Sequence, residues 1–262
     1  DLDSAKLEDV DAFFKTYYAP NNAVLVISGD FAIADARKWI DQYFSKIPAS
    51  KLPEKPDLTE PPQEQEQRFV KEDKLAKKPA FAIGYKMPER NTPEFYAMGL
   101  IDQMLGQGQD SRLYQALVQK KGYTNTVGSG INILLGNMFD YNGPMLWVSN
   151  LVHDSTVVAD SIIRQYDMTI ADLANNVTSE DLQLAMVKMR SSLYDVIGGN
   201  FGLGKVNLLA CFALFDDNPA RINTLESEFR KVTPELIKKT IRTYLTPKNR
   251  TILLIQPKAS NS

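Results

Sequence analysis

The sequence predicts a fold of the α+β class, because strand patterns and helix patterns come in separate runs along most of the chain. Alternating apolar residues between Phe81 and Met87 predict one strand. Two longer strands are expected at Thr126–Phe139 and Met145–Val152, joined by a turn at Asn142-Gly143-Pro144. Four or five helices follow, near residues 155–175, 179–197, 201–215, 219–230 and 234–245, and a last strand is expected at Thr251–Gln256.

The N-terminal part has its own pattern, which is separated from the rest by a change in composition. A helical stripe ends at Tyr17, an apolar strand is expected at Ala23–Ser28, and a second helical stripe runs from Ile33 to Ile47. The following segment, 48–67, is rich in proline and has almost no apolar side chains, which predicts an exposed linker. We therefore divide the chain into residues 1–47, a linker at 48–67, a second body at 68–257 and a frayed tail at 258–262.

Composition excludes several classes of protein. A net charge of −2 gives no polycationic character, so we expect no nucleic-acid partner. The longest apolar runs are too short to cross a bilayer, and the single cysteine, Cys211, reads as a buried apolar residue. The chain begins at Asp1 and its first methionine is Met87, so we expect it to be part of a longer protein.

One stretch, Met104–Gly130, joins an apolar helix to a second, short helix through a loop that contains Gly106 and Gly108. Asp110 is expected to cap the second helix, and Gly122 suits a left-handed residue at its end. Upstream, Thr92 followed by proline predicts the start of the first helix.

The chain also contains an internal repeat. The residues from Thr16 to Asn22, followed by an apolar stretch, match those from Thr243 to Asn249, which an apolar stretch also follows. In both places a helix end, Thr-Tyr, a proline and an asparagine come in the same order and at the same spacing. Either shared turn chemistry or a true duplication explains the match. A duplication would make this chain the end of one repeat followed by one whole repeat.

Three strings resemble one family, the zinc peptidases with an inverted metal motif, which include mitochondrial processing peptidase, pitrilysin and insulin-degrading enzymes. They are FFKTYYAPNNAVLVISGDF at residues 13–31, YAMGLIDQMLGQGQDSRLYQALVQKKG at 96–122 and RTYLTPKNRTILLIQPK at 242–258. The resemblance covers essentially the whole chain. It implies duplicated half-units, each a mainly antiparallel sheet with helices packed on one side, which enclose unfolded or extended peptide in a chamber.

The resemblance also implies where the zinc lies. Catalytic members carry His-x-x-Glu-His in the first repeat, with a distal glutamate as the third ligand. This chain has one histidine, His153, which we interpret as a surface or capping residue rather than as part of a metal site. We therefore expect no zinc in this chain and zinc in the parent protein or in a partner.

Some family members use an arginine and a tyrosine in the second repeat to position substrate. Those places are occupied here by Val118 and Asn125, neither of which matches. Tyr123, two positions away, could substitute for the tyrosine or pack in the core. Arg112 belongs to the common Ser-Arg-Leu-Tyr string and is expected mainly to make a charged contact near the helix start. The candidate substrate-binding residues are therefore Tyr123, Asn125 and Arg112, and no residue is expected to be catalytic.

Two functions remain open on these residues. The first is the C-terminal, non-catalytic domain of a zinc metallopeptidase, which closes the chamber with a homologous repeat or subunit. The alternative is a catalytically silent structural or partner subunit of the same family. The loop at Gln103–Asp110 lies where the processing peptidase's non-catalytic subunit has a glycine-rich substrate loop, and a simple helix connection is the other interpretation of it. Similar bacterial proteins are often exported, which favours the periplasm or cell envelope by analogy.

Overall fold

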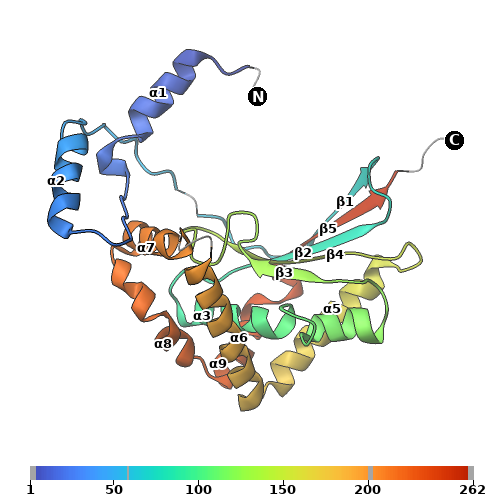
Figure 1. Ribbon diagram of the computed structural model, residues 1–262. Coiled ribbons are helices and arrows are strands. Elements are labelled where there is room, and N and C mark those ends of the chain that lie inside the picture. Colours follow the sequence, from blue (N-terminus) through green and yellow to red (C-terminus); the bar gives the residue numbers. More distant parts are fainter. Residues whose placement is uncertain (1–3, 58, 200–202, 259–262) are drawn as a thin grey trace. The chain divides into compact units, whose positions relative to one another are not determined.

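The computed structural model describes residues 4–57, 59–199 and 203–258 (Figure 1). It divides into two compact units, residues 1–57 with 198–222, and residues 58–197 with 223–262. The boundaries expected at residues 47 and 68 stay a prediction. Linker residue 58, the expected helix start at 201–202 and tail residues 259–262 lie outside the described residues.

The second unit is built on one five-stranded sheet with the order β1-β5-β2-β4-β3. Only β1 and β5 run parallel; the other three neighbouring pairs are antiparallel, which confirms the mainly antiparallel sheet. The strands are β1 (Gln67–Asp73), β2 (Ala80–Lys86), β3 (Gly128–Ile131), β4 (Leu146–Val152) and β5 (Arg250–Pro257).

The helices of this unit pack on one side of the sheet (Figure 1), as expected. They are α3 (Pro93–Leu105), α4 (Arg112–Tyr114), the π-helical turn η3 (Gln115–Lys120), α5 (Ala159–Asn176), α6 (Ser179–Gly198), α8 (Leu225–Arg230), α9 (Pro234–Tyr244) and the short turn η6 (Pro247–Asn249). Alternate residues of β2, namely Phe81, Ile83 and Tyr85, are buried beneath them. From Phe95 to Leu105 every residue of α3 is buried, so this helix lies at the centre of the core.

The strand expected at Thr126–Phe139 is much shorter in the structure, and that prediction is wrong beyond Ile131. Asn132 adopts a left-handed conformation with φ of 58°, which ends the regular ladder. Its buried side chain donates to the carbonyl of Asn137 at 3.0 Å, so residues 132–137 close into a compact loop. Sequence alternation could not show this, because the apolar residues Ile133, Leu134 and Leu135 continue the strand pattern.

The first unit contains α1 (Leu7–Tyr17), η2 (Pro20–Asn22), α2 (Ile33–Phe44), α7 (Leu203–Asp216) and most of η5 (Pro219–Asn223). Both N-terminal helices are confirmed, and Cys211 is buried as expected. The strand expected at Ala23–Ser28 is wrong, because these residues pair with no strand of the described chain. A strand is completed by hydrogen bonds to a neighbouring strand, whatever its side-chain pattern.

No helix of the described chain is, by itself, long and apolar enough to cross a bilayer. Helices α6 and α7 reach the necessary length and composition only when they are counted together.

Candidate functional site

The loop between α3 and α4 is fixed to its surroundings by polar contacts on both sides. Helix α3 begins where Thr92 Oγ1 accepts a hydrogen bond from the backbone N–H of Phe95 at 3.2 Å. It ends at Gly106, which passes close to β3. A Cβ atom at Gly106 would lie 1.8 Å from Ser129 Oγ, so only glycine fits at this crossing. The loop therefore lies directly against the edge strand of the sheet.

A buried carboxylate holds this crossing together. Asp102, on α3, accepts hydrogen bonds from Trp147 Nε1 at 2.7 Å, from Ser129 Oγ at 2.8 Å and from Gln107 Nε2 at 2.9 Å. Gln107 also donates to the backbone carbonyl of Ser129 at 2.9 Å. The loop, β3 and β4 are thus joined through one side chain.

The electrostatics of Asp102 are those of a buried acid with neutral donors. Burial raises the pKa of its carboxyl above the ordinary value, and the hydrogen bonds from Trp147, Ser129 and Gln107 offset part of that rise. Lys188 acts on it only through space. An ionisable side chain in the middle of an apolar helix was visible in the sequence, but sequence reasoning did not single it out.

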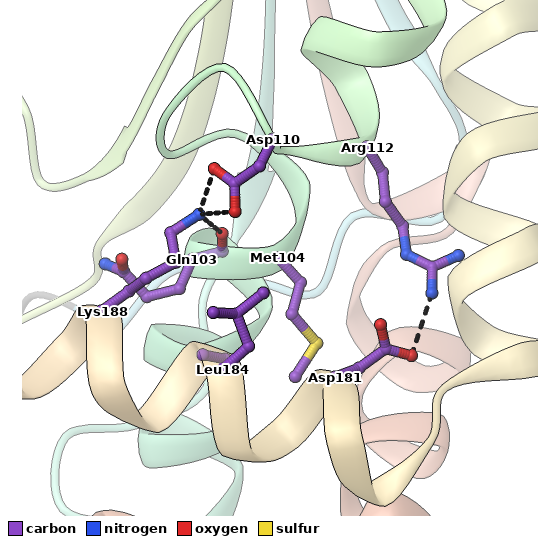
Figure 2. Close-up of a pocket in the computed structure, with 8 residues that line it drawn as sticks. Gln103, Met104, Asp110, Arg112, Asp181, Leu184 and Lys188 are labelled. Atoms are coloured by element: carbon purple, nitrogen blue, oxygen red, sulfur yellow. Dashed lines mark hydrogen bonds and ion pairs between the residues drawn. The ribbon is translucent and has the colours of Figure 1, made fainter.

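On its other side the loop is held by Lys188 of α6. The Lys188 ammonium donates to the carbonyl of Gln103 at 3.1 Å (Figure 2) and to that of Gln107 at 2.5 Å. It also lies 2.9 Å and 3.1 Å from the two carboxylate oxygens of Asp110. Asp110 was expected to cap the second helix, and that prediction is wrong. Ser111 occupies the cap position, and the Asp110 carboxylate pairs with Lys188 instead.

Arg112 makes the charged contact that the sequence predicts. Its guanidinium lies 2.5 Å from Asp172 on α5 and 3.1 Å from Asp181 on α6. Because Arg112 opens α4, these two pairs fasten the short helix to both longer helices. Figure 2 shows Met104 and Leu184 between this cluster and the Lys188 cluster.

Two cavities border these clusters. The one drawn in Figure 2 has a volume of about 60 Å³, enough for a few water molecules and far below the size of a ligand pocket. The other is an open depression of about 400 Å³ between η3 and α5, lined by Arg112, Lys120, Gln165 and Met168 among others. Neither brings together the groups of a hydrolytic centre.

The three candidate substrate-binding residues do not form one cluster. Tyr123 is half-buried beyond the end of η3, where its N–H donates to the carbonyl of Leu117 at 2.9 Å. Asn125 is exposed on the next bend, and Arg112 points towards Asp172 and Asp181. Gly122 adopts the expected left-handed conformation, with φ of 61°. A substrate role for the three residues stays a prediction.

His153 is buried, so the surface alternative in its interpretation as a surface or capping residue is wrong. It is 4% exposed, and its Nδ1 lies 2.9 Å from the carbonyl oxygen of Asp154. Thr124 pairs with it through the backbone, which closes β4 against the segment after η3. Within the described part of the chain, no three side chains among histidine, cysteine, aspartate and glutamate are grouped to hold a metal ion.

Comparison with known proteins now identifies the family. The family model of the peptidase M16 inactive domain matches residues 4–188, well over half of the 262 residues. The chain is 28% identical over 125 residues to the zinc protease PqqE of Helicobacter pylori, covering 46% of this chain and 28% of that protein.

Solved structures share the fold. A protease from Helicobacter pylori superimposes with a TM-score of 0.81 at 18% identity, over 98% of this chain and 60% of the other. The peptidase M16 inactive domain from Pseudomonas fluorescens superimposes with a TM-score of 0.78 at 18% identity, over 99% of this chain and 59% of the other. The periplasmic protease PqqL of Escherichia coli superimposes with a TM-score of 0.66 at 15% identity, over 88% of this chain and 25% of the other. The chain thus spans less than a third of the curated relative and less than two thirds of each of these structures.

These matches confirm the resemblance to the inverted-motif zinc peptidases. The chain belongs to the peptidase M16 inactive-domain family, the non-catalytic C-terminal type of domain found in relatives of bacterial zinc proteases.

Proposed function

We propose that this chain is the non-catalytic half of a bacterial zinc metallopeptidase, which encloses and positions an extended peptide while a homologous repeat holds the zinc. Membership of the inactive-domain family is the observation that carries the proposal. The single histidine of the sequence agrees with it, since catalytic zinc sites of this class use two.

The loop fixed by Asp102 and Lys188 is the element that we assign to peptide positioning. It lies against β3, which is the edge strand of the sheet within the described residues. Extended peptides bind to sheet edges through main-chain hydrogen bonds, and a loop held rigidly beside an edge adds shape selectivity to that binding. A loop fixed before binding also loses less conformational entropy when a peptide arrives.

The test uses the native polypeptide that contains this chain, alone and mixed with any homologous subunit encoded beside it. Zinc content and peptide cleavage are measured before and after treatment with a chelator. Zinc with chelator-sensitive cleavage, alone or in the mixture, supports the proposal. Absence of zinc and of cleavage in both preparations would overturn it and favour the structural subunit of the family.

The loop assignment has its own test in the same assay. Lys188→Met removes the ammonium that holds the carbonyls of Gln103 and Gln107, whereas Lys120→Met changes an exposed lysine on η3. We expect Lys188→Met to raise KM several-fold with zinc content unchanged, and Lys120→Met to leave KM unchanged. Equal KM values for both variants would remove the loop from the positioning role.

The proposed location is the bacterial periplasm or cell envelope. The structural relative PqqL is described as periplasmic, and the proposal carries that description to this chain by analogy of fold. Fractionation of cells that express the native polypeptide, followed by immunodetection, tests it.

A further inference from the structure

The opposite edge of the sheet, strand β1, has the features of a second binding surface. All seven of its residues are exposed, and its only partner strand in the described residues is β5. Register with β5 places Arg68 and Val70 beside the buried Ile252 and Leu254, on the helix side. Phe69 and Lys71 therefore lie on the other face of the sheet. Phe69 is 51% exposed and Val70 is 55% exposed, so both faces of the edge present apolar surface.

The end of β1 and the turn that follows it are rich in lysine. Lys71, Lys74, Lys77 and Lys78 are all exposed, and none of them makes an ion pair within the described chain. Hydrogen bonds from Thr156 are the main cause of the lowered pKa of Asp154, and the charge of Lys78 adds to that lowering.

The two acids between these lysines are already engaged. The Asp73 carboxylate accepts from the backbone N–H of Leu75 at 2.7 Å, and Glu72 lies 4.0 Å from Lys258. The four lysines outnumber these two acids, so the end of β1 carries a net positive charge beside main-chain groups that pair with no further strand of the described residues.

From this combination we infer that the β1 edge binds an extended acidic peptide segment, whose main chain pairs with β1 and whose carboxylates face the four lysines. Lysine on an edge strand opposes pairing with neutral or basic strands, since the incoming strand must bury or approach a positive charge. The same lysines favour pairing with an acidic strand, because each of its carboxylates is attracted to a nearby ammonium group. Charge thus determines which peptide binds at the edge, and backbone hydrogen bonds to β1 supply the binding contacts. This inference goes beyond the proposed function, since β1 lies across the sheet from the loop beside β3.

The test measures binding to the isolated chain by fluorescence anisotropy. The probes are a fluorescein-labelled heptapeptide that alternates valine with glutamate, its valine–lysine counterpart, and the valine–glutamate peptide N-methylated at alternate residues. We expect the glutamate peptide to bind at least tenfold more tightly than the lysine peptide at low salt. N-methylation should lower the affinity of the glutamate peptide at least tenfold, because it blocks main-chain pairing.

Variants locate the binding site. The double variant Lys77→Glu with Lys78→Glu is expected to lower the affinity for the glutamate peptide at least tenfold. Lys120→Glu with Lys121→Glu, a matched pair of adjacent exposed lysines on the helical side, is expected to change binding less than twofold. Equal effects of the two pairs, or equal affinity of the methylated and unmethylated peptides, would overturn the inference.

A lipid surface is the competing partner, because a basic turn bearing Leu75 at 90% exposure also suits an anionic membrane. Sedimentation with vesicles containing phosphatidylglycerol tests it. Vesicle binding without binding of the glutamate peptide would overturn the inference. None of these results depends on zinc or on peptide cleavage, so failure here leaves the proposed function to its own assay.

Discussion

The internal sequence match compares residues 6–28, the first copy, with residues 233–255, the second copy. The two copies share a sequence pattern but differ in burial. In the alignment that places Thr16 on Thr243, the residues Val10, Phe14, Leu25 and Ile27 correspond to Ile237, Ile241, Ile252 and Leu254. The first four side chains are 46%, 50%, 55% and 47% exposed, whereas the second four are 0%, 2%, 0% and 6% exposed. The same apolar positions are therefore on the surface in one copy and in the core in the other.

Neighbouring strands and helices account for the difference. In the second copy β5 pairs with β1 on one side and with β2 on the other, and α9 packs against α3 and α5. In the first copy the stretch at residues 23–28 has no strand partner in the described chain. An apolar pattern favours a buried strand, but the ladder and the opposing layer have to be supplied. We propose that residues 7–28 belong to a repeat whose sheet is homologous to the one seen here.

The largest expected difference between the copies concerns the apolar strand positions. Ile252→Ala should lower the free energy of unfolding by about 3 kcal/mol, because it opens a cavity in a filled core. Leu25→Ala, at the equivalent position, should change it by less than about 0.5 kcal/mol, because that side chain is exposed. Urea unfolding followed by circular dichroism measures both. A loss for Leu25→Ala as large as that for Ile252→Ala would show that the first copy has a core of its own.

A buried cation sharpens the comparison next. Arg250 donates to Glu66 at 2.6 Å and pairs with Asp167, and its side chain is 5% exposed. Arg250→Met should lower the free energy of unfolding by about 2 kcal/mol in the same urea assay. This is less than the loss expected from breaking a fully buried ion pair, because both carboxylates are partly exposed. Ala23 occupies the equivalent position in the first copy, where Ala23→Met should have little effect.

Adding Glu66→Gln and Asp167→Asn to Arg250→Met provides the control. The triple variant should recover part of the lost unfolding free energy, because the carboxylates left without a partner are neutralised. No recovery would indicate that Arg250 stabilises the unit through packing of its side chain instead.

The pH dependence of stability should report the buried Asp102 of the second unit. Since burial raises the pKa of its carboxyl in the folded state, the folded state binds this proton more tightly than the unfolded chain does. Its contribution to the free energy of unfolding should therefore decrease as pH rises above about 3.9, the ordinary value for aspartate. Asp102→Asn removes the titration, so the difference in unfolding free energy between wild type and variant should shift against the wild type as pH rises. A difference that is constant with pH would contradict the burial effect.

The smallest expected difference lies at the helix starts. Thr233 Oγ1 accepts from the N–H of Leu236 at 3.2 Å and caps α9, whereas Lys6 at the equivalent position of α1 offers no such oxygen. Thr233→Ala should cost about 1 kcal/mol in urea unfolding. Lys6→Ala should be close to neutral in the same assay. A larger loss for Lys6→Ala would place α1 in a more stable context than its exposure indicates.

The elements that sequence predicted well are those fixed by local chemistry. Thr92 and Thr233, each followed by proline, begin helices as their cap chemistry requires, and strict alternation marked β2. The parallel pairing of β1 with β5 could not be predicted from the residues alone, since it joins segments far apart in the sequence through backbone groups that every sequence carries. The early end of β3 depends on a left-handed Asn132, which the apolar pattern does not reveal.

The candidate site shows the same division. Arg112 could be assigned a charged contact from its position at a helix start, but its partners on α5 and α6 come from tertiary packing. Asp110 has the residue type of a helix cap, yet the ammonium of Lys188 is a stronger partner for its carboxylate than backbone N–H groups are. The link from Asp102 to the edge strand depends on the close approach of Gly106 to Ser129, which only the three-dimensional structure reveals.

Amide hydrogen exchange tests the central claim most directly, namely that the chain carries one complete repeat and the end of another that needs a homologous sheet. We expect the amides of residues 24–27 to exchange rapidly in the isolated chain while those of residues 251–254 are protected, and both sets to be protected in the native polypeptide. Protection of residues 24–27 in the isolated chain, equal to that of residues 251–254, would contradict the account.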